Sequence, residues 1–331
     1  MKIYKLLLVS FICLSCKSQT KKINGISFVA SPNKINHKHI TPLKKASANY
    51  VALMPFGFIK SISSPKIRFN EKGQWFGETN EGLKQYAEEF QKEGINVMVK
   101  PQIWVWNGTY TGTIEMNSEE DWFILEKTYK EFILNYAKTA EVLNASIFCI
   151  GTELEKFVEK RPEYWKTLIK EIKKVYSGKL TYAANWDEFK RVPFWNDVDF
   201  IGIDAYFPLS DKKSPTLKEF ELGWQKHKQD IVKVREAVNK PVLFTEYGYR
   251  SVDFTGKEPW NSNRIKGAVN LQNQEKATQA IYNQFWKEDW FAGGFIWKWF
   301  IDHDKAGGSN NNRFTPQNKP TEELLKILYS K

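Results

Sequence analysis

The sequence contains little cysteine, and its distribution excludes a domain held together by disulfides. The 331 residues include three cysteines, and two of them, Cys13 and Cys16, fall in the first sixteen positions. Cys149 remains for the rest of the chain, so no intrachain disulfide framework can form there. Because Cys149 lies inside the apolar run ASIFCIG, we interpret it as a small core residue rather than a reactive thiol.

The chain also lacks a block of basic residues, although its formal net charge is +11. Its lysines are spread over the polar faces of the expected helices, so we expect no nucleic acid as a partner. A glycine-rich phosphate loop after an early strand is missing too, which disfavours a nucleotide-binding sheet. A neutral substrate is compatible with this distribution of charge.

The apolar stretch near the N-terminus, LLLVSFICLS, is too short to span a bilayer as a helix. It follows the positively charged start MKIYK, and Cys16 comes after the small residue Ser15. Residues 1–16 therefore resemble a bacterial lipoprotein signal peptide, although Cys13 stands where leucine is usual. We expect lipidation of Cys16, a polar tether over 17–24 and a lipid-anchored protein of the bacterial cell envelope. A plain secretory signal is the alternative.

Aromatic residues are abundant, with 13 Trp, 14 Tyr and 23 Phe. Such residues can fill a large core, because each ring buries much apolar area. They also suit a sugar-binding cleft, since flat rings match the apolar faces of pyranoses. The composition leaves both interpretations open.

From residue 25 onward, strand-like and helix-like segments alternate. Apolar strands are expected over residues 25–30, 49–58, 95–106, 145–153, 179–186, 198–209, 241–249 and 291–300. Helices are expected near Leu43 and over 80–94, 118–144, 163–176, 216–239, 273–288 and 321–331. These eight strands alternate with helices without a composition break, which predicts a single (β/α)8 TIM barrel over 25–331. An open doubly wound sheet is the alternative.

Two of the expected strands end in a glutamate. Glu153 in IGTELE ends the fourth strand, and Glu246 in FTEYGYRS ends the seventh. The carboxyl ends of all barrel strands open onto one face, so these side chains can meet across its mouth. Glycoside hydrolysis needs such a pair, one acid to protonate the leaving oxygen and another to act at the anomeric carbon. Taken singly, either glutamate could be a solvated charge, which is how we interpret Glu155.

The stretches KPQIW, IGTELE, AANW, DAYFPL, FTEYGYRS and GGFIWKWF resemble glycoside hydrolase family 113, β-mannanases of the clan A retaining glycosidases. The tail RFTPQNKPTEELL is also similar to the end of that family, and the resemblance runs from about Gly25 to the C-terminus. It implies that Glu153 is the general acid/base and Glu246 the nucleophile of a retaining double displacement. The implied substrate is β-1,4-linked mannan, glucomannan or a manno-oligosaccharide.

Other functions remain compatible with the same residues. The substrate could be a different β-linked glycan, and a transglycosylase would share every residue of the site. A non-catalytic, lipid-anchored glycan-binding protein is the alternative from another class, although such a protein has no need of both carboxylates. We expect a monomer that requires no metal and no cofactor.

The resemblance also implies substrate-binding residues. Tyr206 is placed like a tyrosine that orients the nucleophile in the clan, and Trp297 like the ring beneath the cleaved sugar. Thr152 replaces an asparagine that binds the 2-hydroxyl in most members of the clan. Asn185, at the end of the fifth strand, is the candidate replacement.

Further aromatic residues are candidates on position alone. Trp104 and Trp106 follow the third strand and Trp186 follows the fifth, where they could form platforms for neighbouring sugars. Trp299 shares a strand face with Trp297, so periodicity does not choose between them. His303 lies between Asp302 and Asp304, which could suggest a metal site, but we expect a solvated loop there.

Overall fold

The computed structural model describes residues 21–261 and 267–331. The expected signal peptide over 1–16, with its lipidation site Cys16, lies outside the described residues. The first strand begins at Ile23, inside the segment expected as a tether over 17–24. Ile23 is buried, and the Lys22 ammonium donates to two backbone carbonyls of the barrel region, so these residues belong to the folded domain.

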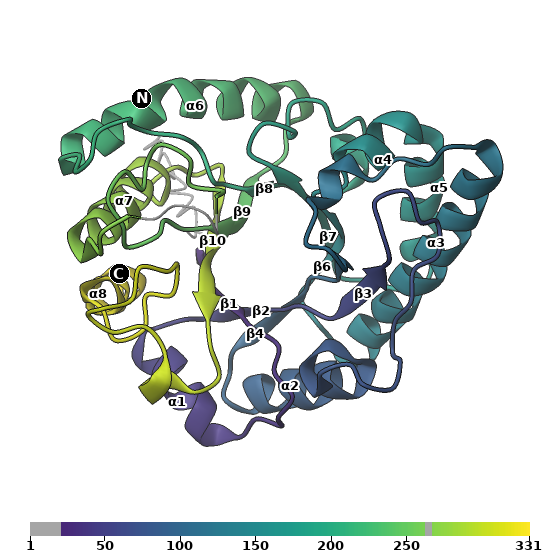
Figure 1. Ribbon diagram of the computed structural model, residues 1–331, viewed down its shortest axis with the longest axis horizontal. Helices are drawn as coiled ribbons and strands as arrows, with labels where there is room; N and C mark the ends of the chain where they lie inside the picture. Colours follow the sequence, from purple (N-terminus) through teal and green to yellow (C-terminus); the bar gives the residue numbers. More distant parts are fainter. Residues whose placement is uncertain (1–20, 262–266) are drawn as a thin grey trace, which may run out of the picture.

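Within the described residues, eight parallel strands close into a barrel (Figure 1). They are β1 (Ile23–Phe28), β2 (Tyr50–Leu53), β4 (Asn96–Val99), β6 (Ile147–Thr152), β7 (Lys179–Asn185), β8 (Phe200–Asp204), β9 (Val242–Tyr247) and β10 (Phe291–Trp299). Neighbouring strands pair in the order β1-β10-β9-β8-β7-β6-β4-β2, and β1 pairs with β2 to close the ring. The predicted (β/α)8 fold is confirmed.

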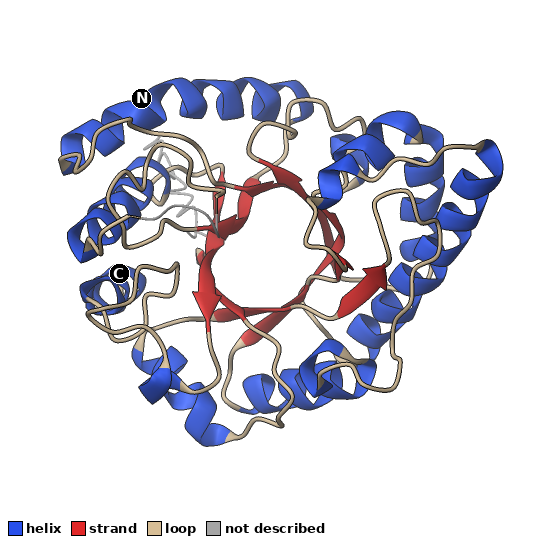
Figure 2. Cartoon of the chain, viewed as in Figure 1, coloured by secondary structure: helices blue, strands red, loops and turns tan. Residues whose placement is uncertain are grey.

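Helices cover the outside of the barrel (Figure 2). Those described are α1 (His37–Lys45), α2 (Asn80–Lys92), α3 (Glu119–Val142), α4 (Glu155–Lys160), α5 (Pro162–Ile172), α6 (Leu217–Val238), α7 (Leu271–Phe285) and α8 (Pro320–Tyr329). Short 3-10 helices are η1 (Phe76–Glu78), η2 (Thr111–Thr113), η3 (Trp195–Asp197) and η4 (His303–Lys305). Across the described ranges, no helix is both long enough and apolar enough to cross a membrane.

The alternation of strands and helices departs from a regular (β/α)8 pattern at two places. β6 is followed by two helices, because α4 ends before Arg161 and a new helix, α5, begins at Pro162. β7 is followed by η3 rather than an α-helix. This connection is short and contains Pro193, which cannot donate a helical hydrogen bond.

The second and third expected strands are each interrupted by a proline. The barrel strand β2 is followed by β3 (Phe56–Ile59) after Pro55, and β4 by β5 (Gln102–Val105) after Pro101. Proline has no N–H to continue the ladder. β3 and β5 therefore separate from the barrel and pair with each other in parallel. In Figure 1, β3 lies outside the ring of barrel strands.

The core has two parts. A large apolar cluster joins strands and helices, while a smaller one unites six residues from six barrel strands: Ile23, Ala52, Met98, Ile147, Leu243 and Phe295. We place the smaller cluster inside the barrel, because its members come from around the ring and contact one another. Along β4, β6 and β9, its members precede the polar residues Lys100, Glu153 and Glu246 described below.

Candidate active site

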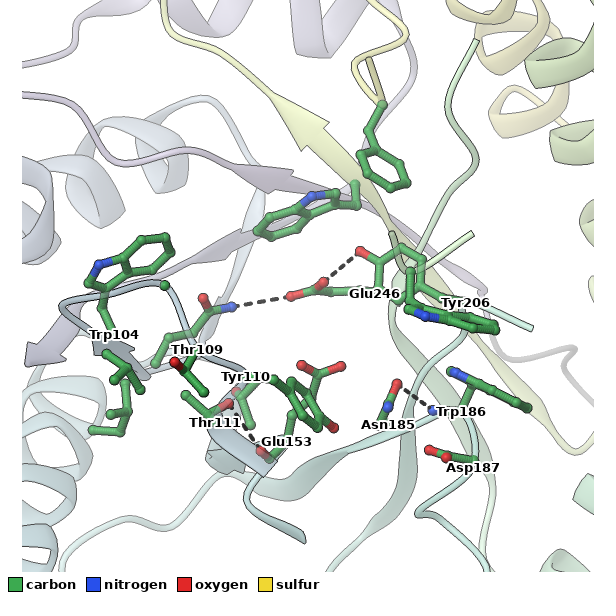
Figure 3. A pocket seen from close by; sticks show the side chains of 18 residues that line it. Trp104, Thr109, Tyr110, Thr111, Glu153, Asn185, Trp186, Asp187, Tyr206 and Glu246 are labelled. Atoms are coloured by element: carbon green, nitrogen blue, oxygen red, sulfur yellow. Dashed lines mark hydrogen bonds between the residues drawn. The ribbon is translucent and has the colours of Figure 1, made fainter. Parts of the chain in front are cut away.

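A cleft of about 700 Å³ opens at the carboxyl ends of the barrel strands. Its lining brings together the sequence-predicted residues Trp104, Glu153, Asn185, Tyr206, Glu246 and Trp297. Figure 3 shows Trp104 and Trp186 at opposite ends of this region, with Glu246 between them. The location is the one that TIM-barrel enzymes use for catalysis.

Glu246 lies on β9, and its carboxylate is held from several sides. Tyr206 Oη donates to Glu246 Oε2 at 2.7 Å, and Gln102 Nε2 donates to Oε1 at 3.2 Å (Figure 3). The ammonium of Lys100 also donates to Oε1. With 6% of its surface exposed, Glu246 is confined to one orientation at the floor of the cleft.

Lys100 and Asp204 form a buried ionic group beneath the nucleophile candidate. Lys100 follows β4 and donates to both oxygens of Asp204 at 3.1 Å as well as to Glu246. Asp204 ends β8, and it accepts a further hydrogen bond from Thr245 Oγ1 at 2.7 Å. Register places Asn185, Asp204 and Glu246 next to one another across β7, β8 and β9. Three adjacent strands therefore hold this part of the site rigidly.

The pKa values of this group reflect burial and mutual charge. Burial alone would lower the pKa of Lys100, but the charges of Asp204 and Glu246 outweigh it and raise that pKa above its ordinary value. Burial, followed by the charge of Glu246, raises the pKa of Asp204 to about 7. Lys100 opposes that rise.

Sequence reasoning missed Lys100, Asp204 and Gln102 as site residues. A signal was present, because Lys100 interrupts the apolar run VMVKPQIW and Asp204 interrupts FIGIDAYF. A charged side chain in a buried strand needs a partner of opposite charge. Which partner it has could not be deduced from one strand alone.

Glu153 follows β6 directly and has a left-handed backbone conformation, with φ of 50°. This conformation is uncommon outside glycine, and it turns the chain from β6 towards α4. The Glu153 N–H donates to the Ala183 carbonyl at 2.8 Å, and Thr111 Oγ1 donates to the Glu153 carbonyl at 3.1 Å. Backbone bonds on both sides hold Glu153 in place.

Burial raises the pKa of Glu153 well above its ordinary value, and the charges of Asp204 and Glu246 raise it further. Lys100 opposes this effect but is outweighed. Glu153 therefore retains its proton at a pH where an exposed glutamate has lost it. A protonated carboxyl beside a second carboxylate has the properties of a general acid.

A buried chain of hydrogen bonds connects the backbone after Glu153 to the next strand. The Leu154 N–H donates to Tyr182 Oη at 2.7 Å, and Tyr182 donates to Glu188 Oε1 at 2.6 Å. Glu188 also accepts from the Asn185 N–H at 3.0 Å, and burial raises its pKa to about 8. This series of hydrogen bonds links the backbone next to Glu153 to the backbone of Asn185.

The aromatic candidates occupy different environments. Trp297 lines the cleft, whereas Trp299 is completely buried. Strand periodicity could not choose between these two residues, and the structure places only Trp297 where a substrate could contact it. Trp186 stacks on Trp260 with ring centroids 5.0 Å apart and planes 17° from parallel, and both line the cleft. Trp260 was not expected from the sequence. Trp106 is 70% exposed and lines a neighbouring pocket.

His303 does not join Asp302 and Asp304 as a ligand group. Its Nε2 lies 3.0 Å from Glu322 Oε1, and its Nδ1 lies 3.5 Å from Asp304. Across residues 21–261 and 267–331, no cluster of three or more His, Cys, Asp or Glu side chains could hold a metal ion. Cys149 is free and buried, and burial raises its pKa to about 11, which disfavours the reactive thiolate.

A closed barrel that carries two glutamates after its fourth and within its seventh strand, in one aromatic-lined cleft, defines a glycoside hydrolase. Comparison with known sequences names the family. A sequence model of Glycoside Hydrolase Family 113 matches residues 32–319, so the chain belongs to this family. Comparison with curated proteins finds no match.

Solved structures agree with this assignment. The GH113 β-mannanase AaManA from Alicyclobacillus acidocaldarius, in complex with ManMIm, superposes with a TM-score of 0.81 at 25% identity. The match covers 93% of this chain and 97% of that one. A complex of a GH113 β-1,4-mannanase also gives 0.81, at 23% identity over 94% and 99% of the two chains.

A more distant similarity extends to a larger enzyme. The β-glucuronidase of Faecalibacterium prausnitzii gives a TM-score of 0.62 at 15% identity, over 93% of this chain and 49% of that one. At this identity the likeness shows the barrel fold alone.

Proposed function

We propose that this glycoside hydrolase is a retaining β-mannanase, which cleaves β-1,4-mannosidic bonds by double displacement. The observation that supports this mechanism is that the two carboxyl groups have different surroundings. Glu246 accepts hydrogen bonds from Lys100, Gln102 and Tyr206, which hold its carboxyl group in the orientation of a nucleophile. Glu153 has a raised pKa, which favours a proton donor.

In the first step, Glu246 Oε attacks the anomeric carbon while the Glu153 carboxyl gives its proton to the departing glycosidic oxygen. A covalent glycosyl–enzyme ester forms, and the shortened glycan leaves. In the second step, the Glu153 carboxylate accepts a proton from water, whose oxygen attacks the anomeric carbon and releases Glu246. The family resemblance predicts a distance of about 5–5.5 Å between the two carboxyl groups, the spacing for retention.

Anomeric analysis tests the stereochemistry. Proton NMR of a fresh digest of mannopentaose is expected to show the β-anomer first, before mutarotation. Initial appearance of the α-anomer would mean inversion, and the double displacement would be wrong. Product analysis on the same samples separates hydrolysis from transglycosylation, which lengthens part of the substrate.

A mannan substrate is supported by family membership and by two similar structures described as β-mannanases. Asn185 lies in the cleft beside Asp204 and Glu246 in register, and we propose that its side-chain amide binds the axial 2-hydroxyl of mannose. Asn185→Ala should then lower kcat/KM for a manno-oligosaccharide about tenfold or more, the effect of a lost hydrogen bond near the reacting centre. Unchanged turnover would exclude this role.

The substrate class is tested by the release of reducing ends from mannan, glucomannan, mannopentaose and cello-oligosaccharides. The wild-type protein should act on the mannose-containing substrates, and Glu246→Ala and Glu153→Ala should lose almost all activity. Glu323→Gln is the matched control, because Glu323 is an exposed glutamate on α8 and should leave activity unchanged. Faster release from cello-oligosaccharides would favour a β-glucanase. Binding without release would favour a glycan-binding protein.

We also propose that the enzyme is attached to the bacterial envelope through lipid on Cys16, as the signal-like N-terminus suggests. Expression in a bacterium with labelled palmitate should label the wild-type protein and place it in the membrane fraction. Cys16→Ser should abolish the label and release soluble protein. A labelled Cys16→Ser variant would refute this attachment. Light scattering of a soluble form tests our expectation of a monomer.

A further inference from the structure

The small sheet of β3 and β5 presents an aromatic face to solvent. Along β5, Gln102 and Trp104 are exposed to different degrees while Ile103 and Val105 are buried, so the even-numbered side chains share one outer face. Trp106 continues this pattern, because its N–H still donates to the Ile59 carbonyl at 3.1 Å. The hydrogen bonding between β3 and β5 therefore continues one residue beyond Val105, and that residue adds an exposed ring to the outer face.

This face begins at the catalytic carboxylate and leads away from it. Gln102 donates to Glu246, Trp104 lines the active-site cleft, and Trp106 lies beyond it. At about 3.3 Å per residue, four residues of parallel strand extend about 13 Å. The rings of Trp104 and Trp106 therefore follow one another outward from the nucleophile candidate.

A second pocket of about 550 Å³ lies at the far end of this face. Trp104 lines both pockets, so the second one lies next to the active-site cleft. The segment between β3 and η1 forms its other wall, where Arg68 pairs with Phe58 across an antiparallel bridge. Gln74 Nε2 donates to the Phe56 carbonyl at 3.1 Å and fastens this segment to the sheet.

The pocket combines exposed rings with mixed polar groups. Trp75, Trp104 and Trp106 are 51%, 50% and 70% exposed, which leaves much aromatic surface in water without a partner in the described chain. Arg68 and Lys72 are balanced by Glu71 and Glu78 in the same lining. Arg68 Nε already donates to Glu71 at 2.8 Å. Such a lining favours a neutral ligand that has flat apolar faces and hydroxyl groups.

We propose that this pocket binds a distal segment of the polysaccharide whose cleaved bond lies in the active-site cleft. The inference rests on the proposed glycanase function and extends it to long substrates. The position of Trp104 in both linings, the outward row of rings and the balanced charges all fit a neutral glycan chain. Trp75 and Trp106 are the rings that contact it beyond the cleft.

Two measurements test the proposal. The first compares kcat/KM for mannan with kcat/KM for mannotriose, which is too short to reach from the cleft into the second pocket. Trp75→Ala and Trp106→Ala should each lower the ratio of the two values about fivefold to tenfold, as expected when an aromatic anchor is truncated. Phe123→Ala is the control, because Phe123 is a 66% exposed ring on α3, and it should keep the wild-type ratio. A wild-type ratio in both tryptophan variants would overturn the proposal.

The second measurement separates this inference from the proposed function. Affinity electrophoresis in gels that contain mannan, glucomannan or a soluble cellulose derivative detects binding without cleavage. Glu246→Gln should be retarded by one of these polymers, and addition of Trp75→Ala should weaken that retardation about tenfold. Retardation that depends on Trp75 in a protein that releases no reducing ends would refute the hydrolase proposal and support the binding site.

Hydrolysis of mannotriose without retardation by any polymer would refute the binding site and leave the hydrolase proposal intact. A second copy of the chain could occupy the pocket instead. Light scattering would then show a dimer that Trp75→Ala dissociates, and that result would also overturn the glycan assignment.

Discussion

Replacement of Lys100 by methionine tests the ionic group beneath the cleft. Methionine keeps most of the apolar stem of lysine but removes the ammonium. Lys100 is fully buried, and the change leaves Asp204 and Glu246 facing each other without a cation between them. We expect both stability and activity to fall.

The magnitude follows from burial. Removal of one partner from a buried ion pair costs about 3–5 kcal/mol of unfolding free energy, because a charge remains unpaired in a medium of low polarity. For a domain of this size, 1 kcal/mol corresponds to about 2 °C of melting temperature, so Lys100→Met should melt about 6–10 °C lower. That loss is within the about 5–15 kcal/mol that stabilises a typical domain, so the variant should still fold.

Thermal unfolding followed by circular dichroism measures the effect, and kcat on mannan measures its consequence at the site. Lys179→Met is the matched control, because Lys179 pairs with Asp199 at 2.9 Å on the surface. An exposed pair contributes about 0–1 kcal/mol, so the control should melt within about 2 °C of wild type. The double variant Lys100→Met/Asp204→Asn removes one charge of each sign and should recover part of the lost stability.

Two results would contradict this reasoning. If Lys100→Met has the same melting temperature as Lys179→Met, the buried ammonium is not the compensating charge that the geometry indicates. The double variant could instead show only the sum of the two single losses. A double-mutant cycle would then give no coupling between Lys100 and Asp204, contrary to their direct contact at 3.1 Å.

Three further predictions concern the two candidate catalytic carboxyls and the groups that hold them. Tyr206→Phe removes the 2.7 Å hydrogen bond to Glu246 and should lower kcat about 10- to 100-fold with little change in melting temperature. Tyr182→Phe removes the acceptor of the Leu154 N–H and should cost about 1–3 kcal/mol in urea unfolding, whereas equal midpoints would contradict the buried contact. Because burial and neighbouring carboxylates raise the pKa of Glu153, kcat/KM should fall on the alkaline side as this proton is lost, at a higher pH than for an ordinary glutamate. Glu153→Gln should lack that limb, and an unchanged alkaline limb would assign it to another group.

The sequence by itself determined the barrel and the position of its two glutamates. Apolar runs recur at the spacing of eight strands, and Glu153 and Glu246 stand at strand ends. Since parallel strands of a closed barrel all end on one face, that placement was enough to bring the residues to one cleft. These are local and repetitive signals, which a single chain displays in its linear order.

The sequence did not predict how segments distant in the chain pair, or which of two similar side chains becomes buried. Pro55 and Pro101 were visible, but their effect depends on the two displaced segments pairing with each other as β3 and β5. Likewise, Trp297 and Trp299 share the period of a strand, and only the closed fold buries one and leaves the other in the cleft.

Only the tertiary structure decided how the carboxylates are charged and held. Lys100, Asp204 and Glu246 come from three strands separated by about a hundred and by about forty residues of sequence, and each looks unfavourable in its own apolar run. Their burial becomes tolerable because the barrel places opposite charges in contact and excludes water from them. Electrostatic partnership of this kind depends on distances in space, which the periodicity of a sequence does not contain.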